Sequence, residues 1–184
     1  MHTDRRSLSG WGNTAPSVAT VVELTTPELT SPGALQLLGD LDRGVIARGL
    51  GRSYGDPAQN AGGTVIRLDD DLIALDPDSG TVTTGAGVSL DTLLRHIVPR
   101  GWFVPVTPGT RFVTVGGCIA SDVHGKGHHV DGSFGSHVLA MTMLLADGST
   151  RRVTAESDPD LWWATIGGMG LTGIIVDATF RLIP

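Results

Sequence analysis

The spacing of apolar and polar positions along the chain predicts many short strands and few helices. Short apolar or alternating segments that end at Gly, Pro, Asn, Asp or Ser are typical of strands. Such segments cover residues 18–24, 45–47, 64–68, 72–75, 81–84, 102–106, 137–145, 151–154 and 172–182. Strand–helix units come early in the chain and hairpins come late, so the order of elements favours an α+β fold over a regular doubly wound sheet.

Helical periodicity is confined to a few short segments. Apolar residues with a 3.6-residue spacing predict a helix over residues 88–97, with Ser89 as its N-cap. Ser31 as N-cap, followed by a proline, predicts a second helix that ends near Asp42. A third helix is expected over residues 157–164. The first 16 residues or so carry no such pattern, and we expect an irregular N-terminal segment there.

Composition indicates a folded chain that does not bind nucleic acid. The 184 residues are 40% hydrophobic and 17% charged, too apolar for a disordered chain. The net charge of −6 offers no basic surface that could neutralise a run of phosphates. With neither a signal peptide nor an apolar stretch of about 20 residues, the chain reads as soluble.

Three apolar residues are expected inside the protein. Cys118 is the only cysteine, so no internal disulfide can form, and its apolar neighbours predict a buried and inert thiol. Trp162 and Trp163 lie in the third predicted helix, and both are expected to anchor the core. None of the three is a candidate for chemistry.

The first candidate site is the segment 49–55, in the glycine-rich loop 48–57 that follows the strand at 45–47. Three glycines at 49, 51 and 55 allow sharp turns that bring backbone N–H groups close to a phosphate, and Arg48 and Arg52 could add charge. A tight structural loop is the alternative. A nicotinamide-binding motif is rejected, because the glycine spacing is G-x-G-x-x-x-G and residues 56–63 are a poor helix sequence.

The second and third candidates lie between residues 108 and 129. Small residues at 108–124 would allow a ligand to approach the backbone. Four of the six histidines fall between His124 and His137, together with Lys126, the only lysine. Zinc binding by His124 and His128 would require a helix, and Gly125 argues against one, so a polar ligand or a catalytic role on a loop is favoured and no metal is expected.

Several of these motifs, taken in order, resemble one family. They are S-G-W-G at 9–12, A-R-G-L-G-R-S-Y-G-D at 47–56, P-G-T-R at 108–111, V-T-V-G-G at 113–117, H-G-K at 124–126, H-H at 128–129 and G-L-T-G-I-I at 170–175. The chain is similar, from about Leu8 onward, to the FAD-binding half of the decaprenylphosphoryl-β-D-ribose 2-oxidases, within the vanillyl-alcohol-oxidase type of flavoenzymes.

The resemblance implies a two-lobed α+β FAD-binding domain over residues 1–184, with mixed and antiparallel sheets, flanking helices and the cofactor between the lobes. Where covalent members carry a histidine this chain has Arg52, so non-covalent FAD is expected. The implied cofactor contacts are Ala47, Arg48, Gly49, Leu50, Gly51, Arg52, Ser53, Tyr54, Gly55, Asp56, Pro57, Gly109, Thr114, Val115, Gly116, Gly117, Ser121, Asp122, Val123, His124 and Ile174.

The resemblance also implies a reaction. The flavin would take a hydride from C2′ of a polyprenylphosphoryl ribose, and a reductase partner would complete epimerisation to arabinose for cell-wall arabinan. Tyr54, His124 and Lys126 match catalytic positions, with Lys126 contacting the substrate phosphate and His124 orienting the substrate or handling a proton. The family's substrate-binding domain is expected to be missing from this chain through truncation, so the fragment alone should be inactive. The complete enzyme would work at a membrane surface.

Some positions depart from the family pattern. Cys118 stands where alanine is expected, Ser121 where cysteine is expected, and Gly127 and Met169 where asparagine is expected. These departures leave two alternatives open. One is an oxidase of the same superfamily acting on an alditol or another small alcohol, and the other is a non-catalytic binding module with the same fold.

Overall fold

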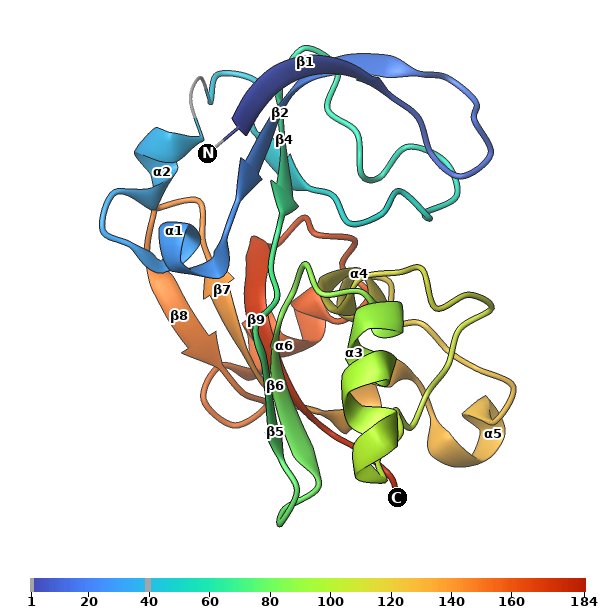
Figure 1. The fold of residues 1–184 in the computed structure, drawn as a ribbon. Helices are drawn as coiled ribbons and strands as arrows, with labels where there is room; N and C mark the ends of the chain where they lie inside the picture. Colours follow the sequence, from blue (N-terminus) through green and yellow to red (C-terminus); the bar gives the residue numbers. More distant parts are fainter. Residues whose placement is uncertain (1, 39–40) are drawn as a thin grey trace.

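The computed structural model describes residues 2–38 and 41–184 as two lobes, each built on one β-sheet (Figure 1). The first sheet has the order β1-β2-β4-β3, from β1 (His2–Leu8), β2 (Ser17–Leu24), β3 (Val45–Ala47) and β4 (Thr64–Leu68). Strands β2, β4 and β3 run parallel, and β1 pairs antiparallel with β2. This sheet is therefore mixed.

The second sheet is antiparallel throughout and has the order β5-β6-β9-β7-β8. Its strands are β5 (Ile73–Asp76), β6 (Thr81–Gly85), β7 (Val138–Leu144), β8 (Thr150–Val153) and β9 (Ile174–Arg181). Both predicted hairpins form, β5 with β6 and β7 with β8. One mixed and one antiparallel sheet confirm the predicted α+β class.

Short helices flank the sheets (Figure 1). The first lobe carries α1 (Thr26–Thr30) and α2 (Ala34–Leu37), while the second carries α3 (Leu90–Ile97), α4 (Val115–Ala120), α5 (His128–Asp131) and α6 (Pro159–Thr165), with 3-10 turns at Val98–Arg100 and Phe134–His137. The predicted cap of α3 is present, because Ser89 Oγ accepts a hydrogen bond of 3.0 Å from Thr92 N. None of the helices in the described ranges is long and apolar enough to cross a membrane.

The lobes share an apolar seam in addition to their own cores. The main core lies in the second lobe and includes Phe134 and Phe180, whose ring centroids are 5.1 Å apart. A second cluster joins the lobes, and its buried members are Val22, Leu24, Leu29, Ala34, Leu38, Ile66, Leu144, Ile174 and Val176. Burial of apolar surface is the main driving force for such contacts. The lobes therefore pack as one body with a junction between them.

The structure corrects two predictions in the first lobe. Residues 2–8 form β1, because pairing along the open edge of β2 satisfies the backbone groups without an apolar pattern of side chains. Ser31 ends a helix instead of starting one: its N–H donates to Glu28 O at the C-cap of α1. Gly33, with φ of 86°, precedes α2, which ends at Leu37. Part of the predicted stretch to residue 42, at positions 39–40, lies outside the described residues.

Two further predictions fail in the second lobe. Residues 102–106 form no strand; Phe103 makes only an isolated bridge to Ile183. Trp163 is 63% exposed and does not anchor the core, whereas Trp162 is 2% exposed and does. Two adjacent residues on a helix point in directions about 100° apart, so only one of them can face the sheet.

Candidate cofactor-binding site

A groove runs between the two lobes, where the loop after β3 faces α4 and the loop before β9. It consists of two adjoining pockets, and the wider one has a volume of about 480 Å³, within the usual range for small-molecule sites. Residues common to both pockets come from the two lobes and are mostly small: Gly49, Ser53, Ala58, Thr114, Gly117, Ser121 and Met169. Small side chains leave the backbone accessible to a ligand.

The loop after β3 carries hydrogen-bond donors that the chain does not use. Within the described residues, the backbone N–H groups of positions 49–55 have no partner. Gly51 and Gly55 have φ angles of 70° and 72°, which favour glycine. A Cβ at Gly49 would collide with the Thr114 hydroxyl of the other lobe. Successive free N–H groups in a turning backbone form a concave site for an anion.

The two arginines of this loop differ in role. The guanidinium of Arg48 donates to Ser9 O at 2.6 Å and to Ala58 O at 3.0 Å, so it ties the loop to the N-terminal segment. Burial, and then the charge of Arg67, lower the pKa of Arg48. Arg52 is exposed, lies 4.9 Å from the centroid of the Trp11 ring and lines the wider pocket. Nη1 of Arg52 donates to Leu50 O at 3.0 Å, and the rest of its exposed guanidinium is available to a ligand.

Helix α4 contributes small side chains to the groove, while the backbone N–H groups of its first turn already have partners. Thr114 is its N-cap and accepts from Gly117 N at 3.1 Å. The N–H groups of Val115 and Gly116 donate to carbonyls of the second lobe, Val88 O and Ala86 O, each at 2.9 Å. Sequence reasoning described residues 108–124, which include this helix, only as small residues. Thr114 before an apolar residue was the capping signal that could have revealed the helix.

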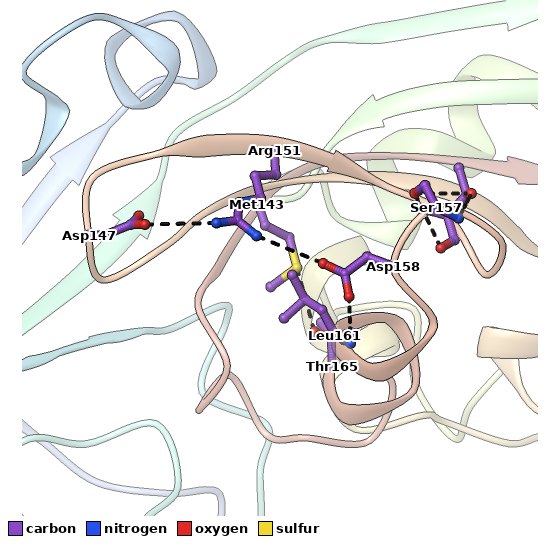
Figure 2. Close-up of polar contacts among 8 residues, drawn as sticks. Met143, Asp147, Arg151, Ser157, Asp158, Leu161 and Thr165 are labelled. Atoms are coloured by element: carbon purple, nitrogen blue, oxygen red, sulfur yellow. Dashed lines mark hydrogen bonds and ion pairs between the residues drawn. The ribbon is translucent and has the colours of Figure 1, made fainter.

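The loop between α6 and β9 lines the rim of the groove through Met169, Gly170 and Gly173. Figure 2 shows the polar contacts that hold α6, the helix from which this loop starts. Asp158 Oδ1 caps α6 by accepting from Leu161 N at 3.2 Å, and Arg151 lies 3.9 Å from the Asp158 carboxylate. The buried Thr165 hydroxyl donates to Leu161 O at 2.7 Å and also lies 2.8 Å from Thr172 Oγ1. The last contact joins the two ends of the loop.

Met169 enters the groove from this loop and has an unusual backbone. Its φ is 54°, which is uncommon for a residue other than glycine, and its N–H donates to Ala120 O at 2.8 Å. Met169 lines both pockets, together with residues that sequence reasoning also missed. A run of glycines at 167, 168, 170 and 173 was the available signal, because it indicates close approach of the backbone.

Of the three predicted catalytic residues, only Tyr54 lines the groove. Tyr54 lines the wider pocket and is 83% exposed. His124 and Lys126 are exposed and lie just beyond Val123, the last pocket residue of that segment. The rings of His124 and His128 meet edge to face at 5.4 Å. Only His128 belongs to α5, so the two histidines do not share a helix, and no group of three or more potential metal ligands gathers in the described part of the chain.

Most of the predicted cofactor contacts line the groove. These are Ala47, Arg48, Gly49, Leu50, Gly51, Arg52, Ser53, Tyr54, Pro57, Gly109, Thr114, Gly116, Gly117, Ser121 and Val123. The predicted contacts that line neither pocket are Gly55, Asp56, Val115, Asp122, His124 and Ile174. Lining residues that were not predicted are Trp11, Ala58, Leu68, Ala86, Gly87, Pro108, Thr110, Val113, Ala120, Met169, Gly170, Gly173 and Ile175.

Three of the predicted contacts that line neither pocket have other partners in the fold. Val115 and Ile174 are buried in apolar clusters, and Asp122 Oδ1 accepts a hydrogen bond of 2.9 Å from Gly135 N. Cys118 is fully buried, and burial raises its pKa to about 12, so its thiol is not a nucleophile at neutral pH. Which groove residues touch a cofactor stays a prediction.

Comparison with known proteins identifies the family. Residues 21–154 match the FAD binding domain family. The chain is 53% identical, over 99% of its length, to the decaprenylphosphoryl-beta-D-ribose oxidase of Mycolicibacterium smegmatis. It is 29% identical over 77% of its length to a putative D-arabinono-1,4-lactone oxidase of Neurospora crassa, and 31% identical over 62% to the human Delta(24)-sterol reductase.

The chain spans only part of each relative, namely 40%, 26% and 22% of their lengths in the same order. The family match covers most of the chain and agrees with two features of the structure. These are the groove between the two lobes and the glycine-rich loop with free N–H groups. The chain therefore belongs to the FAD-binding domain family.

Proposed function

We propose that residues 1–184 are the FAD-binding portion of a flavin-dependent oxidoreductase that oxidises the C2 hydroxyl of a polyprenylphosphoryl ribose. The observation that carries this proposal is the run of free N–H groups at 49–55, of which residues 49–54 line an interlobe groove in a chain 53% identical to a decaprenylphosphoryl-ribose oxidase. An FAD diphosphate needs several donors from a backbone that it can approach closely, and this loop offers them.

The groove residues offer FAD a cation, free N–H groups and small side chains. The loop 48–57 would hold the diphosphate, with Arg52 as a cation that can bind two phosphate oxygens at once. The small residues of α4 and of the rim leave space for flat rings. No histidine or cysteine lines either pocket within the described residues, which supports non-covalent attachment. The flavin, when bound, supplies the acceptor for the hydride of the substrate.

The residues beside the wider pocket would handle the substrate. We place Tyr54 against the flavin and the sugar, since its ring lines the pocket. Lys126 would bind the substrate phosphate as a compact cation with three donors, and His124 would orient the hydroxyl that reacts or take its proton. A reductase would then act on the keto product to complete the epimerisation. Because the substrate is a polyprenyl lipid, the complete enzyme would work at a membrane surface.

FAD titration of the purified chain tests the cofactor. Flavin fluorescence should be quenched on binding, and all flavin should leave the protein on acid precipitation. In Gly49→Ala, the new methyl group collides with Thr114, and we expect FAD binding to be lost or at least tenfold weaker. Gly12→Ala is the matched control, because its Cβ would meet only Thr14 Oγ1, at an ordinary 3.9 Å. A wild-type chain that leaves FAD fluorescence unchanged contradicts the proposal.

The 29% identity to a putative lactone oxidase favours one second candidate, an oxidase acting on a small sugar alcohol or lactone. Flavin reduction in a protein that spans the full length of the relatives separates the two. Reduction by polyprenylphosphoryl ribose, with loss of rate in Lys126→Ala, supports the lipid substrate. Reduction by unphosphorylated sugar alcohols, with no effect of Lys126→Ala, supports the second candidate.

A further inference from the structure

One polar contact lies directly behind the floor of the groove, at the junction of the lobes. Thr26 is the first residue of α1 in the first lobe and is 9% exposed. Its hydroxyl donates to Asp70 Oδ2 and lies 3.3 Å from Val176 O on β9 of the second lobe. Asp70 belongs to the segment that links β4 to β5, where the chain passes from one lobe to the other.

Asp70 is held against the second lobe by its surroundings. Its other carboxylate oxygen accepts from Leu72 N at 3.0 Å, which fixes the turn of the linking segment. A Cβ at Gly85, the last residue of β6, would collide with the Asp70 carboxylate, so this glycine gives the carboxylate its place. A Cβ at Gly87 would likewise collide with Leu68 O. The linking segment and the end of β6 therefore fit tightly against each other.

The same segments form the groove floor. Leu68 from the first lobe faces Ala86 and Gly87 from the second, and all three line the narrower pocket. Asp70 lies two positions after Leu68, and Gly85 lies next to Ala86. The apolar seam holds the lobes together, but apolar contacts are not directional. A hydrogen bond to a charged oxygen is directional and about twice as strong as a neutral one.

We propose that Thr26 and Asp70 form an interlobe latch that sets the width of the groove and thereby its affinity for FAD. Both are positioning residues, since neither lines the groove. The inference rests on the FAD binding proposed above. It adds that part of this affinity depends on a contact outside the site.

Three threonine variants test the latch. Thr26→Val removes the hydroxyl and keeps the shape, Thr26→Ser keeps the hydroxyl, and Thr30→Val is a control on the same helix. The Thr30 hydroxyl bonds only within its helix, to Thr26 O and Pro27 O. At a temperature where all variants are folded, the FAD dissociation constant should rise about tenfold in Thr26→Val and less than about twofold in the other two.

Hydrogen–deuterium exchange without FAD gives a second readout. Peptides covering residues 68–72 and 85–88 should exchange faster in Thr26→Val and at the wild-type rate in Thr26→Ser and Thr30→Val. If the wild-type chain binds FAD, unchanged affinity or unchanged exchange in Thr26→Val overturns the latch. A loss of thermal stability with unchanged affinity indicates a purely structural bond and also overturns it.

Failure of the proposed function is distinguishable from failure of the latch. If the wild-type chain does not bind FAD, the function fails and the effect of the latch on FAD affinity fails with it. Exchange then decides whether the contact holds the two segments together: faster exchange in Thr26→Val supports that contact, and equal exchange refutes it. If Thr26→Val does not fold, the same two measurements on Asp70→Asn decide, because asparagine keeps the volume and can accept only one of the two hydrogen bonds.

Discussion

The variant Thr165→Val tests how much the hydrogen bonds of Thr165 stabilise the loop at the groove rim. The residue is 1% exposed, and its hydroxyl contacts Leu161 O at 2.7 Å and Met143 Sδ at 3.5 Å (Figure 2). It also lies 2.8 Å from Thr172 Oγ1. Valine has nearly the same shape as threonine, so no cavity forms. The decrease in the free energy of unfolding therefore comes from the lost hydrogen bonds alone.

The expected cost follows from these contacts. Each net hydrogen bond contributes about 1 kcal/mol, and the contact to sulfur is weak, so two bonds give about 2 kcal/mol. For a chain of this size, 2 kcal/mol corresponds to a melting temperature lower by about 4 to 8 °C. The Leu161 carbonyl keeps its helical bond from the backbone of Thr165, which places the loss at the lower end of this range.

Urea unfolding of a double-mutant cycle measures the effect. Thr165→Val, Thr172→Val and the double variant should show a coupling of about 1 kcal/mol, because each single variant already breaks the bond between the hydroxyls. FAD affinity should fall in parallel, since this bond closes the loop that carries Met169. A single variant Thr165→Val within about 0.3 kcal/mol of wild type, or additive changes in the cycle, would refute the reasoning.

The remaining predictions concern a thiol, a carboxyl and a helix cap. Cys118 should not react with a thiol reagent at pH 8 in the folded chain and should react fully in urea, because burial raises its pKa to about 12. Burial raises the pKa of Asp177, with a further contribution from Asp70, so the folded state holds this proton more tightly than the unfolded chain does. The Asp177 contribution to stability should therefore increase as pH falls from 7 toward the pKa of this carboxyl in the unfolded chain, opposite in sign to carboxyls whose pKa is lowered, such as Asp76. In pH-dependent melting curves, the difference between wild type and Asp177→Asn should shift in favour of wild type as pH falls. Ser89→Ala should cost about 1 kcal/mol in urea unfolding, since Thr92 N loses its cap; no change would mean that the cap is replaced by water.

Local sequence patterns predicted the elements whose own residues determine them. The helix 90–97 has both a strong apolar stripe and a serine cap, and both hairpins have turn residues between alternating strands. Strand β1 could not be predicted in this way, because an edge strand is stabilised by backbone pairing with β2. The exposure of Trp163 likewise depends on which face of α6 meets the sheet, and that is a tertiary property.

The candidate site also contains residues that local sequence signals reveal and residues that only the tertiary fold brings together. Sequence reasoning found the loop 48–57, because glycine spacing after a strand is a local signal. It missed Met169 and Gly170, which reach the groove only because α6 and Thr165 fold the loop back onto α4. Arg48 and Arg52 looked equivalent as charges, and only the structure shows that the Arg48 guanidinium is already bound to Ser9 O and Ala58 O.

The distribution of free donors gives the two lobes different tasks in the proposed binding of FAD. In the first lobe, the consecutive N–H groups of residues 49–55 are free of partners within the described chain. In the second lobe, α4 uses those of Val115, Gly116 and Gly117 internally, and the N–H groups of Gly109 and Thr110 are free at the edge of the wider pocket. The longer run of donors would place the diphosphate on the first lobe, and the flat rings would rest on the second. If so, neither lobe holds the whole cofactor, and FAD affinity must depend on the distance between them. A variant that loosens the junction without touching the groove should then weaken FAD binding as strongly as one that removes a direct contact.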